Sequence, residues 1–327
     1  MATPLRRPGS VRRTTSIDMW WPNGRDGQLR LLGRARDLWT PADGRSPHIL
    51  AESSVLVDAA PDRTILRIDT DPPRPGVDEL VGARGGGRLR RRLAEALPDE
   101  VAAGTPLALL LDDLAGSTLI AGFAWRQWTP GSTTSETDRP AARRRMTGVC
   151  AGFRPGSSAL DDEGRARDIH DIRPVAPLPN PTDPLGWHQL TEPDGVAMRR
   201  ARRIDVWVVP GESTLRVDSM FQDSSTTPDG GRVAVHEYRI EATVDSEGRL
   251  ATVTADPRVL PYRECPWAAD NVDRVVGAAV SDLRTVVLER LKGTVGCTHL
   301  NDALRALAEV EVLAAPLRAK SIHQEAP

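Results

Sequence analysis

The feature of this sequence that most constrains its fold is a repeated pair of motifs. Residues 12–20, RRTTSIDMW, recur as RRARRIDVW over residues 199–207. A second segment, VDELVGA at residues 77–83, recurs as VDRVVGA at residues 272–278. The two motifs keep their order in each half, and their spacing differs by only eight residues. Because ordered repeats of this kind indicate duplicated structural units, we predict two homologous half-domains.

Within each half, segments with strand character precede segments with helix character. Residues 233–244, VAVHEYRIEATV, alternate apolar and polar side chains, as half-buried antiparallel strands do. Apolar stripes predict helices over residues 270–291 and 298–312. This order predicts an α+β fold in which each half is an antiparallel sheet with helices packed on one face. The expected strands are residues 17–21, 28–35, 49–57 and 64–69, and then 203–209, 214–221, 233–244 and 249–255.

Composition changes divide the chain into four parts: a first half-domain, a connector rich in Pro and Gly, a second half-domain and a tail. The connector opens with a polar segment, residues 129–145, that we predict to be a flexible loop. Its later part, residues 174–188, is rich in proline, which cannot donate to a sheet, and should run over the surface. We expect the halves to be related by a pseudo-twofold axis, like a fused homodimer. The four parts are residues 1–125, 126–197, 198–315 and 316–327.

The net charge and the number of cysteines limit which partners the protein could bind and in which cellular compartment it would reside. The 327 residues carry a formal net charge of −2, which gives no general attraction to nucleic acid or to anionic membranes. Three cysteines are too few for a disulfide framework. The N-terminus lacks the apolar segment of a secretory signal, and the longest apolar run, Leu107–Leu111, is the size of a core patch. We therefore predict a cytoplasmic protein with reduced thiols.

The two halves differ in the residues that can carry chemistry. In the second half, Cys265 precedes the first predicted helix, and Cys297 and His299 open the last one within GCTHL. When the two repeats are aligned, the first half has no thiol and no imidazole at the corresponding positions. We therefore place the candidate site in the second half. The aligned residues of the first half are Thr70, Ala108 and Leu110.

A cysteine at the start of a helix predicts metal or nucleophile chemistry. Free N–H groups and the helix dipole should lower the pKa of Cys297 and favour its thiolate. Two thiolates and one imidazole suit zinc or an iron–sulfur cluster, and Cys265, Cys297 and His299 supply them. Such a site needs either an open position or one more ligand, for which a carboxylate is available. The candidates for it are Asp205, Asp223, Asp273 and Asp302.

Three other interpretations remain open. The cysteines are structural if they simply pack in the core, where free cysteine is common. The protein is a non-catalytic interaction module if a groove between the halves binds a protein or a small ligand. It is a thiol-dependent enzyme if Cys297 is a nucleophile and His299 its base.

Several longer motifs resemble a bacterial family of unassigned function. They are GCTHLNDALRAL, LPYRECPWAADNVDRVVGA and RRARRIDVW in the second half, with CAGFRPGS and DPLGWH in the connector. The resemblance extends over most of the chain. It implies membership of an uncharacterised domain family and no particular activity.

The order of elements in the second half also resembles the U-type iron–sulfur cluster scaffold proteins. Those proteins carry a Cys after the third strand and a His-Cys pair at the last helix, and Cys265, Cys297 and His299 occupy comparable stations. Their first cysteine is absent here, and Asp223 is the nearest substitute. The resemblance implies an accessory protein that binds a metal or an iron–sulfur cluster through Cys265, Cys297, His299 and Asp223.

Overall fold

The computed structural model describes residues 3–129, 145–168, 171–209 and 211–324, with side chains up to residue 318. All eight predicted strands are present, and most are longer than the alternation pattern indicated. They extend through polar and charged residues that the sheet buries on both faces. The strands are β1 (Ser10–Trp20), β2 (Leu29–Thr40), β3 (His48–Ala59), β4 (Ile65–Asp71), β5 (Arg173–Pro174), β6 (Ala197–Val208), β7 (Leu215–Thr226), β8 (Arg232–Val244) and β9 (Leu250–Val259).

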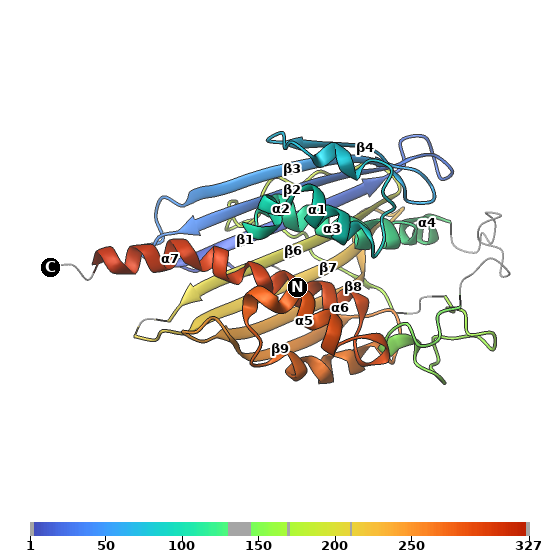
Figure 1. Ribbon diagram of the computed structural model, residues 1–327. Coiled ribbons are helices and arrows are strands. Elements are labelled where there is room, and N and C mark those ends of the chain that lie inside the picture. The colour runs from blue at the N-terminus through green and yellow to red at the C-terminus, as the bar shows by residue number, and fades with distance from the viewer. Residues whose placement is uncertain (1–2, 130–144, 169–170, 210, 325–327) are drawn as a thin grey trace.

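The strands form one continuous antiparallel sheet of nine strands, in the order β4-β3-β2-β1-β6-β7-β8-β5, with β9 also paired to β8 (Figure 1). The groups β1–β4 and β6–β9 meet where β1 pairs with β6, and we call this pair the seam. Its register runs from Ser10 opposite Trp207 to Trp20 opposite Ala197. The fold is therefore α+β, and the sheets of the two halves are joined edge to edge.

Helices cover one face of this sheet (Figure 1). Helix α3 lies over β1, β2 and β3, helix α6 lies over β8, and α7 crosses the seam. The α-helices are α1 (Leu89–Ala96), α2 (Pro98–Ala102), α3 (Pro106–Ile120), α4 (Phe123–Trp128), α5 (Leu283–Arg290), α6 (Thr298–Arg305) and α7 (Val310–Gln324). The 3-10 helices are η1 (Val77–Leu80), η4 (Ala151–Phe153), η5 (Cys265–Val275), η6 (Val280–Asp282), η7 (Gly293–Val295) and η8 (Ala306–Glu309).

The single helix predicted over residues 270–291 is wrong, because the second copy of the VGA motif interrupts it. Gly277 has a φ of 79°, which other residues rarely adopt, and the chain turns back there to the start of β9. Gly277 N donates to Leu250 O at 2.8 Å, and Leu250 N donates to Ala278 O at 2.9 Å. The segment is therefore divided into η5, η6 and α5.

The first copy of the motif makes the same contacts with the start of β4. Gly82 has a φ of 78°, Gly82 N donates to Ile65 O at 2.8 Å, and Ile65 N donates to Ala83 O at 2.9 Å. These matching bonds support the predicted duplication, which stays a prediction.

The repeated Arg and Asp of the first motif pair across the seam. Arg12 Nε lies 2.6 Å from Asp205, and Arg199 Nε lies 2.7 Å from Asp18. All four side chains are buried. Since Arg199 and Asp205 are the repeat counterparts of Arg12 and Asp18, each half supplies one cation and one anion to the same interface.

Two hydrophobic cores lie under the helices, one on each side of the seam. Ile17 and Leu31 belong to the first core, and Phe221 and Ile240 belong to the second. Residues 106–128, spanning α3 and α4, are the one described stretch long and apolar enough to cross a membrane, and 83% of its apolar window is buried in the fold. Such burial is typical of a core helix. The cytoplasmic location stays a prediction.

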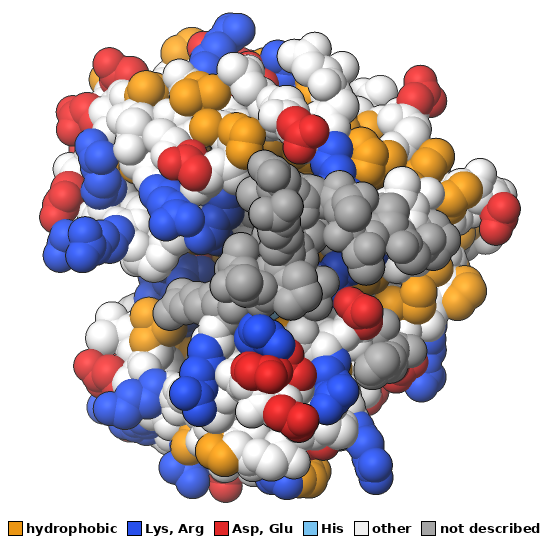
Figure 2. Space-filling view, turned by 90° about the vertical axis from the view of Figure 1, so that its right-hand side faces the viewer, with side chains coloured by type: hydrophobic (Ala, Val, Ile, Leu, Met, Phe, Trp, Pro, Cys, Tyr) orange, Lys and Arg blue, Asp and Glu red, His pale blue; other side chains and the backbone are white. Residues whose placement is uncertain are grey.

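The connector covers part of the opposite face of the sheet. Trp187 and His188 are 3% and 6% exposed, so the Pro-rich part is packed on the sheet rather than simply laid over the surface. The predicted flexible loop falls mainly on residues 130–144, outside the described residues. Figure 2 shows basic and acidic side chains interspersed over one end of the molecule, in keeping with the near-neutral net charge.

Candidate metal centre

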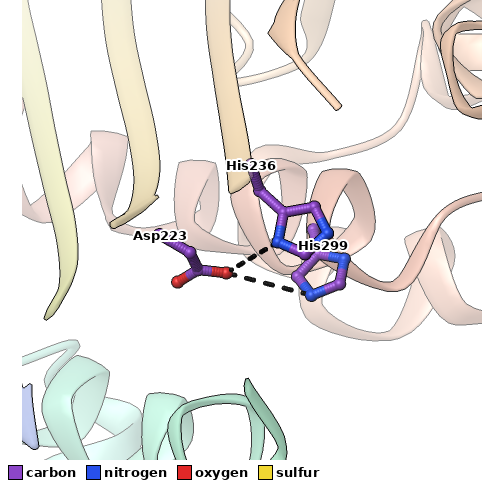
Figure 3. Close-up of side chains that lie close together, drawn as sticks. All are labelled: Asp223, His236 and His299. Atoms are coloured by element: carbon purple, nitrogen blue, oxygen red, sulfur yellow. Dashed lines mark ion pairs between the residues drawn. The ribbon is translucent and has the colours of Figure 1, made fainter. Parts of the chain in front are cut away.

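Asp223, His236 and His299 converge under the second half of the sheet. Asp223 on β7 lies directly opposite His236 on β8, and strand alternation turns both toward the helices. His299 lies in the first turn of α6 and reaches back toward the two strands (Figure 3). The site thus depends on three elements of the second half.

The three side chains offer ligand atoms at short range. His236 Nδ1 lies 3.2 Å from Asp223 Oδ2, and His299 Nε2 lies 3.8 Å from the same oxygen. One ligand atom from each residue lies within 4.8 Å of the others. The imidazole rings stack with their centroids 3.4 Å apart and their planes at 21° (Figure 3).

Asp223 is fully buried and remains ionised. Burial alone would raise its pKa, but the Arg200 guanidinium, helped by His236, holds the pKa of that carboxyl well below its usual range. Arg200 donates to the two carboxylate oxygens at 2.9 and 3.0 Å. The positive charge of Arg200 also faces Asp113 at 3.6 Å and Asp302 at 3.3 Å. A buried carboxylate is therefore fixed beside the two imidazoles.

Both histidines are neutral at physiological pH. Burial lowers the pKa of His236, and burial together with the neighbouring His236 lowers the pKa of His299. His236 is 4% exposed, yet its Nδ1 makes no well-aligned hydrogen bond. Its contact with Asp223 has the distance of an ion pair without hydrogen-bond geometry. Neutral imidazoles are the form that binds metals.

The structure brings together only part of the predicted ligand set. Asp223 and His299 join His236 in one group, and neither Cys265 nor Cys297 belongs to it. Cys297 caps the N-terminus of α6, as predicted, and its Sγ lies 4.0 Å from His299 Nδ1. Asp223, Cys265, Cys297 and His299 do not form one ligand group among the described residues.

The predicted low pKa of Cys297 is wrong. Burial raises the pKa of this thiol despite its position at the start of α6, where its side chain makes no capping hydrogen bond. Burial also raises the pKa of Cys265, and it raises that of Cys150 to about 11. Desolvation therefore outweighs the helix terminus, since a thiolate at this depth loses more hydration than the N–H groups replace.

Sequence reasoning missed His236 and Cys150. His236 lies within the strand predicted over residues 233–244, but its convergence with Asp223 depends on the pairing of β7 with β8. Asp223 lies two residues beyond the predicted strand 214–221, so no pattern in the sequence paired it with His236. Cys150 lies in an irregular segment just before η4, where no periodicity relates it to Cys265.

The first half has the charged pair of this site without the histidines. Arg13 donates to both oxygens of Asp37 at 2.7 Å, as Arg200 does to Asp223. Ala51 occupies the place opposite Asp37 on the neighbouring strand, where the second half has His236. The two imidazoles are thus particular to the second half.

A pocket of about 270 Å³ lies on the other face of β7 and β8. Its lining includes Arg203, Met220 and Gln222 of the second half together with Thr3 and Pro4 of the first. The binding of a protein or a small ligand in a groove between the halves stays a prediction.

Comparisons with known proteins agree with an uncharacterised domain. No curated protein matches this chain. A crystal structure of lipopolysaccharide binding protein has a TM-score of 0.15 and 8% identity, over 96% of this chain and 91% of that one; so low a score carries no argument. Residues 198–313, which hold all of the site residues above except Cys150, match the model of a family described as "Protein of unknown function (DUF2889)". Over residues 198–313 the chain is therefore similar to a domain of unknown function.

Proposed function

We propose that the second half is a metal-binding domain that holds one divalent transition-metal ion through Asp223, His236 and His299. One observation carries this proposal: ligand atoms from three separate elements lie within 4.8 Å of one another in a buried place. The ligand set of two imidazoles and one carboxylate favours zinc or ferrous iron.

The spacing of the ligand atoms fits a single ion. Tetrahedral zinc with bonds of about 2.0–2.1 Å holds its ligand atoms roughly 3.4 Å apart. The contacts of 3.2 and 3.8 Å to Asp223 Oδ2 bracket that separation. The His299 side chain is 17% exposed, which provides a side from which an ion enters.

The charge around the carboxylate also supports the proposal. An unpaired Arg200 guanidinium would repel a nearby cation. Its positive charge is instead neutralised by the carboxylates of Asp223, Asp113 and Asp302. The absence of thiolates from this ligand set favours a single ion over an iron–sulfur cluster, which cysteines usually hold. The likeness to iron–sulfur scaffold proteins therefore stays a prediction.

The first prediction concerns metal content. Metal-free protein should bind one equivalent of Zn²⁺, or of Co²⁺ as a spectroscopic probe, and His236→Gln should lower the affinity at least tenfold. Calorimetry and the visible absorption of Co²⁺ measure both. His48→Gln is the matched control, because His48 is exposed on β3 and stacks on Trp39. Equal affinity in wild type and His236→Gln, or no binding by folded wild type, contradicts the proposal.

A second candidate function rests on the order of Cys297, His299 and Asp223. His299 turns Nδ1 toward the sulfur at 4.0 Å and Nε2 toward the carboxylate at 3.8 Å, which is the arrangement of a thiol nucleophile, its base and an orienting acid. Cys297 is only 4% exposed and its pKa is raised, so the metal centre is favoured. Rapid alkylation of Cys297 in the folded protein, slowed by His299→Gln, would reverse that preference.

A further inference from the structure

The pocket on the face of the sheet opposite the candidate metal centre contains buried polar side chains. Met220 and Gln222 of β7 line it and alternate with Phe221, which lies in the core under the helices. Glu237 of β8 also lines the pocket and lies directly opposite Gln222 in the sheet. Gln222 and Glu237 are 3% and 5% exposed, and we call this buried pair the floor of the pocket.

Both side chains of the floor can accept further hydrogen bonds. Gln222 Nε2 donates to Glu237 Oε2 at 2.8 Å, and among the described residues no donor meets Oε1 of Gln222. A carboxylate has about four acceptor positions, so the bond from Gln222 uses only part of the capacity of Glu237. An ammonium group supplies three donors and a positive charge. The floor therefore suits the amine of a ligand.

Positive charge lines the more open part of the pocket. The side chains of Arg239 and Arg258 are 35% and 33% exposed, and we call this pair the rim. Arg258 contacts Asp256 through Nε at 2.6 Å, and Arg239 contacts Asp218 and Glu241 through Nη2 alone. The other guanidinium nitrogens of the rim make no hydrogen bond to the described residues. Because guanidinium groups bind carboxylates strongly, the rim suits an acidic group of a ligand.

Met220 and Pro4 add apolar surface to the same pocket, and we call this pair the wall. The connector holds the residue before Pro4 in place. Trp187 Nε1 donates to Thr3 Oγ1, and Asn180 Nδ2 donates to Thr3 O, both at 2.9 Å. At about 270 Å³ the pocket lies just below the usual range of ligand sites, about 300–1,000 Å³, so its occupant must be small.

We propose that this pocket binds a small α-amino acid with an aliphatic side chain. The ammonium group contacts the floor, the carboxylate contacts the rim, and the side chain packs on the wall. An amine without a carboxylate leaves the donors of the rim unused, and a carboxylic acid without an amine leaves the floor without a cation. Arg203 and Asp218, which also line the pocket, pair with each other and add no net charge.

The test is calorimetric titration of the full chain with L-leucine, in the presence of EDTA so that the amino acid cannot bind through a metal ion. Two analogues are titrated in parallel: 4-methylpentanoate lacks the amine, and 3-methylbutylamine lacks the carboxylate. L-leucine should bind at one molecule per chain, and each analogue should bind at least tenfold more weakly. Because the three molecules share the same aliphatic chain, the difference measures the two charged groups.

Arg258→Gln should weaken the binding of L-leucine at least tenfold. Arg67→Gln is the matched control, because Arg67 lies on the fourth strand of the first half and contacts Asp69 through Nε at 2.6 Å, as Arg258 contacts Asp256. The proposal is overturned if folded wild type shows no saturable binding of L-leucine, if either analogue binds equally well, or if Arg258→Gln binds like the control. The comparison of the three ligands uses the wild type alone, so a variant that fails to fold does not affect it.

Discussion

At the scale of single residues, burial decides the chemistry of the titratable groups in this protein. His188 is an example on the connector-covered face of the sheet, away from the candidate metal centre. Its two ring nitrogens lie 2.9 Å from Thr14 Oγ1 and 2.8 Å from Ser16 Oγ. Burial, helped by Arg36, Arg199 and Arg34, lowers its pKa to about 3, so the ring is neutral in the folded protein.

We predict that His188 makes stability depend on pH. Below about pH 6.5 the unfolded chain takes up a proton that the folded chain refuses until about pH 3. The unfolded state then binds more protons, so the free energy of unfolding falls as the pH falls through this window. Between pH 7 and pH 5 the wild type should lose about 2 kcal/mol more than His188→Gln in urea unfolding. If both proteins lost the same free energy of unfolding between pH 7 and pH 5, His188 would be protonated in the folded protein, which contradicts the prediction.

At the scale of elements, α3 is placed by charges as well as by apolar packing. The helix is almost entirely buried, and it carries Asp113 opposite Arg202 of β6 at 2.6 Å. Gly116 lies one turn further on, where α3 passes directly over Arg200. The lack of a side chain at Gly116 lets the helix approach a guanidinium that Asp223 already holds at two nitrogens.

Gly116→Ala tests this close packing. A Cβ there would lie 1.9 Å from Arg200 Nη1, so the helix or the ion pair must shift, and we expect destabilisation by about 1–3 kcal/mol. Helix propensity alone predicts the opposite sign, a gain of up to about 1 kcal/mol. Gly122→Ala is the control, because Gly122 has a helical φ of −60° and open space around it. Urea unfolding in which Gly116→Ala is as stable as the control would contradict the packing argument.

At the scale of the whole molecule, the seam holds two similar halves in one sheet. Its buried ion pairs are reciprocal, and loss of one partner of such a pair costs about 3–5 kcal/mol because the other charge is left unpaired. If the halves arose by duplication, β1 occupies the place that a second copy of β6 once held.

Such a duplication predicts the oligomeric state of the second half when it is produced alone. A chain of residues 193–318 should form a dimer through β6, because Arg199 and Asp205 of one copy would face Asp205 and Arg199 of the other, as Arg12 and Asp18 do now. Light scattering at several concentrations measures the mass, and Asp205→Ser should shift the protein to monomer. A folded monomer of the unaltered chain, or a chain that folds only with residues 3–129 added, would contradict the prediction.

The sequence by itself determined those features that depend on neighbouring residues. Segments of strand character predicted every long strand, and GCTHL marked the start of α6 with Cys297 at its N-terminus. It also placed the candidate chemistry in the second half and named Asp223 and His299 among its residues. Periodicity and capping act over a few residues, so the local sequence is sufficient for them.

Only the tertiary structure decided which of those residues meet. The pairing of β7 with β8 puts His236 opposite Asp223, and α6 brings His299 to both from more than sixty residues further along the chain. The fold also buries Cys297, which raises the pKa of its thiol where the helix terminus alone predicts a decrease. Strand register, burial and desolvation arise from contacts between distant segments, and no local pattern encodes them.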